Sequence, residues 1–215
     1  MIDFFKSGFY QVHKLFNFSF FVLIFTFCII LFSCSTPNKK IKHNHDLLNT
    51  FELKSLHNGD IILRKGYGLV SNLIVKELNE KYKISHCGII EIKNGKINVI
   101  HSVSHSLSDF DGVQKNTIAD FLKGSTWGSV IVVRARQTDT LTEKHIISKA
   151  NYYLSKKVRF DSSFNFNDSS EFFCQEFIYK AYDLIPNSKS IKFSPFTDTN
   201  NFRIIINHQS GLKKQ

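Results

Sequence analysis

The sequence predicts a domain of the α+β class, which combines α-helices with β-strands, and two observations predict it. The stretch from Ile84 to His101 contains two strand-like runs joined by Asn94-Gly95. This dipeptide is the strongest short hairpin signal, because a type I′ turn needs positive φ at both central residues. Several other segments repeat apolar residues at intervals of three and four, which is the spacing of an amphipathic helix.

The hairpin itself brings two histidines together. With a two-residue loop at Asn94-Gly95, Gly88 lies opposite His101, and His86 shares their face because side chains alternate along a strand. His86 and His101 are then diagonal neighbours, roughly 7–8 Å apart at the backbone. We expect Gly88 to leave the space above the strand open. Two imidazoles side by side are more typical of a catalytic base and its orienting partner than of core packing.

The other elements follow from apolar spacing and from residues that start or stop helices. In the last predicted helix Cys174 lies in the first turn, the preceding Asp168 to Glu171 supply N-caps, and Pro186 stops the helix. In chain order we predict a strand at 61–64, a helix at 69–78, a short helix at 117–122 after a long loop, a strand at 129–136, and helices at 142–154 and 171–182.

The N-terminal segment is predicted to lie outside the fold. Lys6 and Lys14 form a basic start, residues 15–32 are almost entirely apolar, and a small residue then precedes Cys34. This pattern describes a secretory signal and looks like a bacterial lipobox, in which Cys34 would be acylated. A retained transmembrane anchor is the alternative. We therefore expect a signal peptide at 1–33, a flexible tether at 34–50 and the domain at 51–215, held in the cell envelope.

Composition excludes several classes of function. The chain has 215 residues and a formal net charge of +10, but its lysines are scattered rather than clustered. It has no zinc-ligand spacing, no glycine-rich phosphate loop and no basic stripe interleaved with aromatic residues, so we expect no metal, no cofactor and no nucleic-acid partner. A basic surface suits an anionic lipid or cell-wall polymer, or simply solubility. We expect a monomer.

Cys174 is the candidate nucleophile. A helix N-terminus lowers the pKa of a thiol, and a nearby imidazole lowers it further; the alternative is a buried cysteine on a helix face. Cys87 has the opposite parity to His86, so we expect it to be a small buried hydrophobic residue. The same parity disfavours a Cys87–Cys174 disulfide. His105 and Glu91 are rival partners for His86, but Glu91 falls on the wrong face and His105 lies beyond the strand.

Three motifs in this order resemble the circularly permuted NlpC/P60 cysteine hydrolases, and most of all the YiiX/YebB-like subgroup. They are Gly59-Asp60-Ile61-Ile62, Ile84-Ser85-His86-Cys87-Gly88-Ile89 and Phe172-Phe173-Cys174-Gln175-Glu176-Phe177. The resemblance spans residues 56–185. It implies a permuted papain-like α+β fold, with an antiparallel sheet or barrel packed against the helix that bears the nucleophilic cysteine.

The resemblance also implies roles for individual residues. Cys174 would be the nucleophile, His86 the general base and acid, and His101 the third polar residue, where many relatives have Glu. Gln175 stands where a small Ser is usual, so it is expected at the mouth of the site. We expect Gln175, Gly88 and Tyr67 to contact substrate.

The implied function is a membrane-tethered, exported cysteine hydrolase that cleaves an amide bond through an acyl-enzyme. Peptidoglycan stem peptides are the first candidate substrate. The alternatives are a lipid amidase, thioesterase or acyltransferase that acts on N-acyl or ester lipids, and a catalytically inactive binding lipoprotein.

Overall fold

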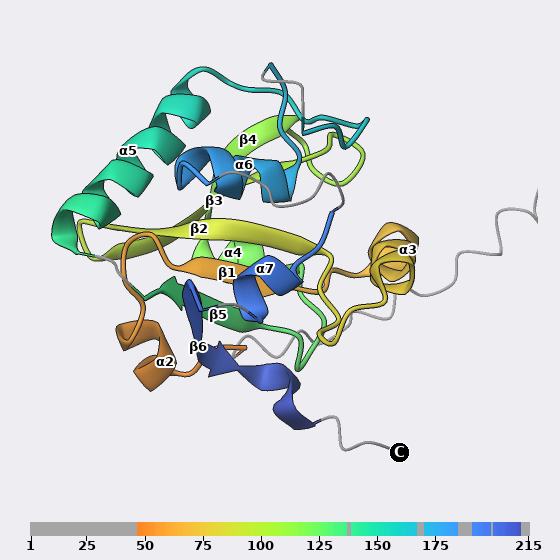
Figure 1. The fold of residues 1–215 in the computed structure, drawn as a ribbon, viewed down its shortest axis with the longest axis horizontal. Helices are drawn as coiled ribbons and strands as arrows, with labels where there is room; N and C mark the ends of the chain where they lie inside the picture. The colour runs from red at the N-terminus through yellow and green to blue at the C-terminus, as the bar shows by residue number, and fades with distance from the viewer. Residues whose placement is uncertain (1–46, 137–138, 167–169, 185–190, 199, 212–215) are drawn as a thin grey trace, which may run out of the picture. The chain divides into compact units, whose positions relative to one another are not determined.

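The computed structural model describes residues 47–136, 139–166, 170–184, 191–198 and 200–211. Contacts divide the chain into residues 1–42 and residues 43–215, and the described residues all belong to the second unit (Figure 1). The predicted signal segment and Cys34 lie outside the described residues. No helix of the described ranges is long and apolar enough to cross a membrane.

The centre of the fold is a six-stranded antiparallel sheet with the strand order β4-β3-β2-β1-β5-β6. The predicted strands are confirmed. Two strands were not predicted: β4, inside a segment expected to be a loop, and the edge strand β6. The bounds are β1 Ile61–Arg64, β2 His86–Lys93, β3 Lys96–Val103, β4 Gly112–Thr117, β5 Ile131–Ala135 and β6 Phe202–Asn207.

Helices cover both faces of the sheet, which confirms the α+β class. The last predicted helix begins at Cys174, with Phe173 as an N-cap that makes no side-chain capping bond, so the prediction that it starts near residue 171 was too early. The helices are α2 Thr50–Lys54, α3 Gly68–Leu78, α4 Ile118–Lys123, α5 Thr140–Ser155, α6 Cys174–Ala181 and α7 Ser194–Thr197, followed by a 3₁₀ turn at His208–Gly211.

The predicted hairpin register is confirmed. Lys93 pairs with Lys96 and Ile89 with Ile100, and the two turn residues between the strands have positive φ. The space above Gly88 is not open, however. A Cβ added there would lie 2.5 Å from Val99 Cγ1 and 3.1 Å from His101 Cβ, so the glycine allows close packing of the two strands.

Buried apolar residues form two cores, one on each face of the sheet. One core lies between the sheet and helices α5 and α6, and contains Cys87 and Phe177. The other lies on the opposite face and contains Phe121 of α4. Leu47 and Leu48 are buried in this second core, so the folded domain begins before residue 51 and takes in the end of the predicted tether.

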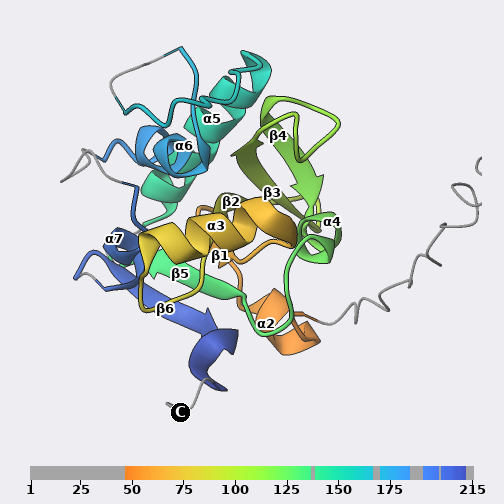
Figure 2. The same cartoon turned by 90° about the vertical axis from the view of Figure 1, so that its right-hand side faces the viewer.

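Helix α3 lies across the end of the sheet where β1 ends and β2 begins (Figures 1 and 2). The apolar stripe that predicts this helix faces largely outward. Leu69, Val70 and Leu73 are 73%, 46% and 54% exposed, and Ser71 is the buried residue of the helix. This face is unusual, because the apolar side of a surface helix normally packs against the core.

Candidate active site

Three side chains on neighbouring strands form a continuous series of hydrogen bonds. The Nε2 atom of His86 on β2 lies 2.8 Å from Nδ1 of His101 on β3. The Nε2 atom of His101 lies 2.7 Å from the Oδ1 atom of Asn116 on β4. His101 pairs with Gln114 across the β3–β4 ladder, so Asn116 two residues later shares its face.

This series determines where the protons lie. An amide oxygen only accepts, so Nε2 of His101 donates to Asn116, and Nδ1 of a neutral His101 is a bare acceptor. Nε2 of His86 therefore donates to His101, which leaves Nδ1 of a neutral His86 bare. An imidazole with a bare nitrogen can accept a proton, so this arrangement can serve a general base.

The surroundings of the two rings keep them neutral. Burial lowers the pKa of His101 to about 4, against the opposing effect of its bond to Asn116. Burial lowers the pKa of His86 well below its ordinary value, and the positive charges of Arg64 and His101 lower it further. The ring of Phe121 covers both, with centroids 5.7 Å from His86 and 5.2 Å from His101. Protonation would put an unpaired charge into this apolar setting.

Cys174 is the first residue of α6, at the helix end where the backbone dipole favours negative charge. Hydrogen bonding from the Cys87 thiol lowers the pKa of Cys174; burial opposes this, and backbone N–H groups of Cys87 and Gln175 add to it. Burial and contact with Cys174 raise the pKa of Cys87 well above its ordinary value. Both thiols are free, and Cys87 is a partner of Cys174 rather than merely a small core residue.

The structure brings the predicted nucleophile and the histidine pair to the same end of the sheet from its two faces. Cys174 packs with the core that contains Cys87, whereas His86 packs on Phe121. The Leu63–Cys87 pair of the β1–β2 ladder directly adjoins the Arg64–His86 pair. Within the described residues, no hydrogen bond joins the Cys174 thiol to the His86 ring.

Sequence reasoning missed two residues of this cluster. Arg64 is the last residue of β1 and lies directly opposite His86. The only sequence signal for Arg64 was its place as a lone cation at the end of the apolar strand that follows Gly59-Asp60. Asn116 was missed because it lies on β4, which was predicted to be a loop; recognising that strand and its register would have been needed to place it.

Three other residues considered for the site lie outside the histidine cluster. Gln175 is 1% exposed and its Oε1 accepts from the Lys192 backbone, so it lies in the interior and not at the mouth of the site. Tyr67 is the partly exposed N-cap residue of α3. His105 is exposed in the turn after β3, and its backbone N–H donates to Asp111.

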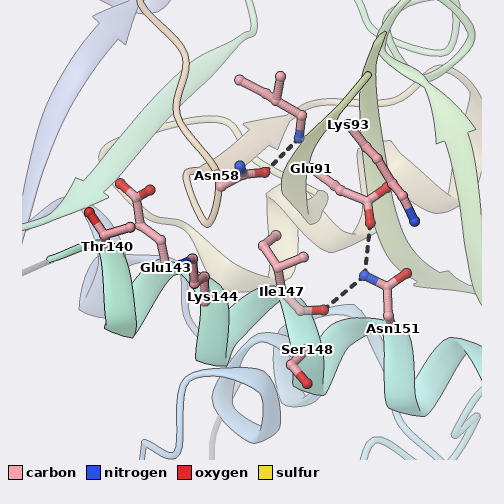
Figure 3. Close-up of a pocket in the computed structure, with 10 residues that line it drawn as sticks. Asn58, Glu91, Lys93, Thr140, Glu143, Lys144, Ile147, Ser148 and Asn151 are labelled. Carbon is pink, nitrogen blue, oxygen red and sulfur yellow. Dashed lines mark hydrogen bonds between the residues drawn. The ribbon is translucent and has the colours of Figure 1, made fainter. Parts of the chain in front are cut away.

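Glu91 lies away from His86, as its parity predicts. It is buried and accepts hydrogen bonds from Lys115 at 2.7 Å and from Asn151 of α5 at 2.8 Å. It lines a hollow of about 410 Å³ between the far end of β2 and α5, where Asn58 also binds the backbone of Ile92 (Figure 3). Both carboxylate oxygens of Glu91 already accept hydrogen bonds, so the role of Glu91 here is to join β2 to β4 and α5.

A second hollow, of about 350 Å³, is lined by residues 126–129, by His208 and Gln209, and by two lysines. Lys65, which follows Arg64 in the chain, and Lys83, just before the strand that begins with His86, supply two cationic amines to its wall. Trp127 also lines it and is 80% exposed. These groups can bind an anionic ligand that offers a flat or apolar surface to the indole.

The chain is similar to known proteins in both sequence and fold. Residues 55–201 match the model of a family described as permuted papain-like amidase enzymes, YaeF/YiiX, C92 family. The fold is similar to a crystal structure of metalloprotein yiiX from Escherichia coli O157:H7, with a TM-score of 0.50 and 22% sequence identity. The match covers 59% of this chain and 64% of that one, less than two thirds of its length. No curated protein matches the chain.

That solved structure is described as a metalloprotein, and a protein metal site needs several ligand side chains close together. Across the described ranges, no group of three or more His, Cys, Asp or Glu side chains could hold a metal ion. In the histidine cluster, the ring nitrogens that face one another and Asn116 are already engaged in hydrogen bonds. These residues do not fit a metal, and no step proposed below uses one.

Proposed function

The chain belongs to the permuted papain-like amidase family (YaeF/YiiX, C92), and from this premise we propose that it is an exported cysteine amidase tethered to a membrane through acylated Cys34. Family membership supports the amidase or hydrolase class. In our proposal Cys174 is the nucleophile, His86 is the general base and acid, and His101 orients His86.

The proposed reaction is acyl transfer through an acyl-enzyme. The bare Nδ1 of His86 takes the proton of the Cys174 thiol as the sulfur attacks the amide carbonyl carbon, and the backbone N–H of Cys174 donates to the resulting oxyanion. The C–N bond then breaks and His86 gives its proton to the leaving amine. His86 next deprotonates a water molecule as its oxygen attacks the thioester carbonyl carbon. The C–S bond then breaks to release the carboxylic acid, and His86 returns the proton to the sulfur.

One observation carries this proposal: the hydrogen bonds that run from Asn116 through His101 to His86. They hold the proton of His86 on Nε2 and leave Nδ1 as the acceptor that a general base needs. Cys87 follows His86 in β2 and contacts Cys174, so the two reacting groups lie at the same end of the sheet, on its opposite faces.

The first candidate substrate is an amide bond in an acidic peptide, such as a peptidoglycan stem peptide. The hollow lined by Lys65, Lys83 and Trp127 supports this choice, because the ammonium groups of its two lysines can bind carboxylates, and Lys65 directly follows Arg64 in the chain. An exported location would also give access to the cell wall.

The second candidate substrate is an N-acyl lipid. The outward apolar face of α3 supports it, because Leu69, Val70 and Leu73 lie on a helix at the same end of the sheet as the site. A membrane-facing helix of this kind would bring the site to the bilayer surface, where a lipid amide resides.

Hydrolysis assays with purified muropeptides and with vesicles that contain N-acyl lipids test the function and separate the two substrates. We expect Cys174→Ala and His86→Ala to abolish hydrolysis, and His105→Ala, which alters an exposed histidine in a loop, to retain it. Hydrolysis that persists in both site variants would contradict the assignment. Activity on neither substrate class, with an unreactive Cys174, would favour the inactive binding protein.

Surface variants sharpen the choice of substrate. For an acidic peptide, Lys65→Glu with Lys83→Glu should raise KM, because repulsion replaces attraction at the hollow. For a lipid, Leu69→Ser with Leu73→Ser should instead lower hydrolysis in vesicles, because less apolar area is buried in the bilayer. The pair of substitutions that leaves the activity unchanged identifies the substrate class that is wrong.

A further inference from the structure

Arg64 is a half-buried cation that forms no ion pair within the described residues. Its Nε and Nη1 atoms are shielded from solvent and have no hydrogen-bond partner within the described part of the chain. None of the ion pairs formed by the described residues includes it. Burying an unpaired charge is costly, so a guanidinium in this position is expected to serve an anion.

The surrounding residues hold the guanidinium in this place. Its Cζ atom lies 4.5 Å from the centroid of the Phe121 ring, which is a cation–π contact. On another side lies Gly124, where an added Cβ would come within 2.5 Å of Nη1. The φ of Gly124 is −82°, which any residue adopts, so room for the guanidinium is the physical reason for glycine here.

Arg64 remains charged despite its burial. Burial lowers the pKa of Arg64 to about 10, and negative charge on Cys174 raises it again. A Coulomb interaction is mutual, so the same guanidinium favours negative charge on the Cys174 sulfur. The ladder places the two groups at the same end of the sheet, because the Leu63–Cys87 pair adjoins Arg64 and Cys87 contacts the Cys174 thiol from the opposite face.

His86 is poorly suited to be the cation of the site. In an ordinary Cys–His pair, a protonated imidazole stabilises the thiolate. Here the ring of His86 is buried against Phe121, is directly opposite Arg64 and donates to His101. A second positive charge beside Arg64 would be repelled.

We propose that Arg64, and not a protonated His86, is the cation that stabilises negative charge on the Cys174 sulfur. His86 then only carries the proton between sulfur, leaving group and water, while Arg64 supplies the fixed charge. Other titratable groups on the two elements that meet at the thiol are Cys87 on β2, and Tyr179 and Glu176 on α6, with the Lys180 amine 3.8 Å from Glu176. The inference rests on the proposed role of Cys174 as nucleophile.

The test is the pH dependence of Cys174 alkylation by iodoacetamide in the full chain, with each cysteine peptide quantified by mass spectrometry. In Arg64→Gln the midpoint of the profile should rise by about one pH unit or more, so that alkylation at neutral pH slows by about tenfold. Arg64→Lys should retain most of the reactivity, because it keeps the charge. His86→Gln should leave the midpoint in place, because a neutral ring contributes no charge.

Gly124→Ala keeps the inference testable if Arg64→Gln does not fold, as judged by circular dichroism. Its methyl group would push on Nη1 and should raise the midpoint in the same direction, by a smaller amount. A midpoint that moves in His86→Gln and stays in Arg64→Gln, Arg64→Lys and Gly124→Ala would overturn the inference. The alkylation assay needs no substrate, so its outcome is independent of whether the proposed amidase activity is found.

Discussion

Replacing Asn116 with Leu removes the only acceptor that the Nε2–H of His101 has in the described structure. His101 is 5% exposed, so this N–H cannot turn to water, and an unsatisfied buried donor costs about 1–3 kcal/mol. The two rings can avoid the cost if both reverse their tautomers. His101 then donates from Nδ1 to His86, and the proton of His86 moves to its own Nδ1.

The penalty gives the size of the expected effect. Since 1.36 kcal/mol is a factor of ten, about 1–3 kcal/mol shifts the tautomer equilibrium by about 5-fold to about 150-fold toward the reversed form. In that form Nδ1 of His86 carries a proton and cannot accept one from Cys174. Amidase activity should fall by a similar factor, with a smaller effect on KM.

Nitrogen NMR of ¹⁵N-histidine-labelled protein measures the tautomers directly, because protonated and bare ring nitrogens have different shifts. Asn116→Asp is the matched control: it keeps an acceptor at the same place, and its charge raises the pKa of His101, so it is compared at about pH 8 where the ring stays neutral. A wild-type His86 that carries its proton on Nδ1 would refute the reasoning. So would an Asn116→Leu variant with both tautomers unchanged.

Two further predictions concern stability, measured by denaturant unfolding. Gly88→Ala should lower the free energy of unfolding by about 1–3 kcal/mol, because its methyl group would lie 2.5 Å from Val99 Cγ1. Val99→Ala in the same chain should recover part of this loss. Strictly additive losses would contradict the packing explanation. Asp60→Ala should lower the free energy of unfolding by about 3–5 kcal/mol, because buried Asp60 accepts hydrogen bonds from two nitrogens of Arg134 at 2.6 and 2.7 Å. A loss under about 1 kcal/mol would contradict a stabilising role for this ion pair.

Much of the local structure could be predicted from the sequence. The Asn94-Gly95 turn and strict alternation set the register that joins His86 to His101, and the structure has that register. The helix that begins at Cys174 was also predicted, although its N-cap is Phe173 and not one of the predicted residues 168–171. These features depend on residues close together in the chain, so their patterns are visible without the rest of the fold.

Long-range packing could not be predicted in the same way. Alternation showed that Cys87 and His86 face opposite sides of the sheet, but not on which side Cys174 would lie. The structure places Cys174 against Cys87 with both thiols free, a contact that alternation along one strand does not predict. The apolar stripe of α3 likewise predicted the helix but not that Leu69 and Leu73 would face outward.

The sequence by itself determined the class of the fold, the histidine hairpin and the motifs that carry the family resemblance, because turn chemistry and periodicity are local properties. Only the tertiary structure decided the environment of the site. It placed Asn116 against His101, put Arg64 opposite His86 with no ion-pair partner among the described residues, and brought Cys174 to Cys87. Those contacts join segments far apart in the chain. The protonation of the side chains in the site depends on burial, which exists only once both cores have formed.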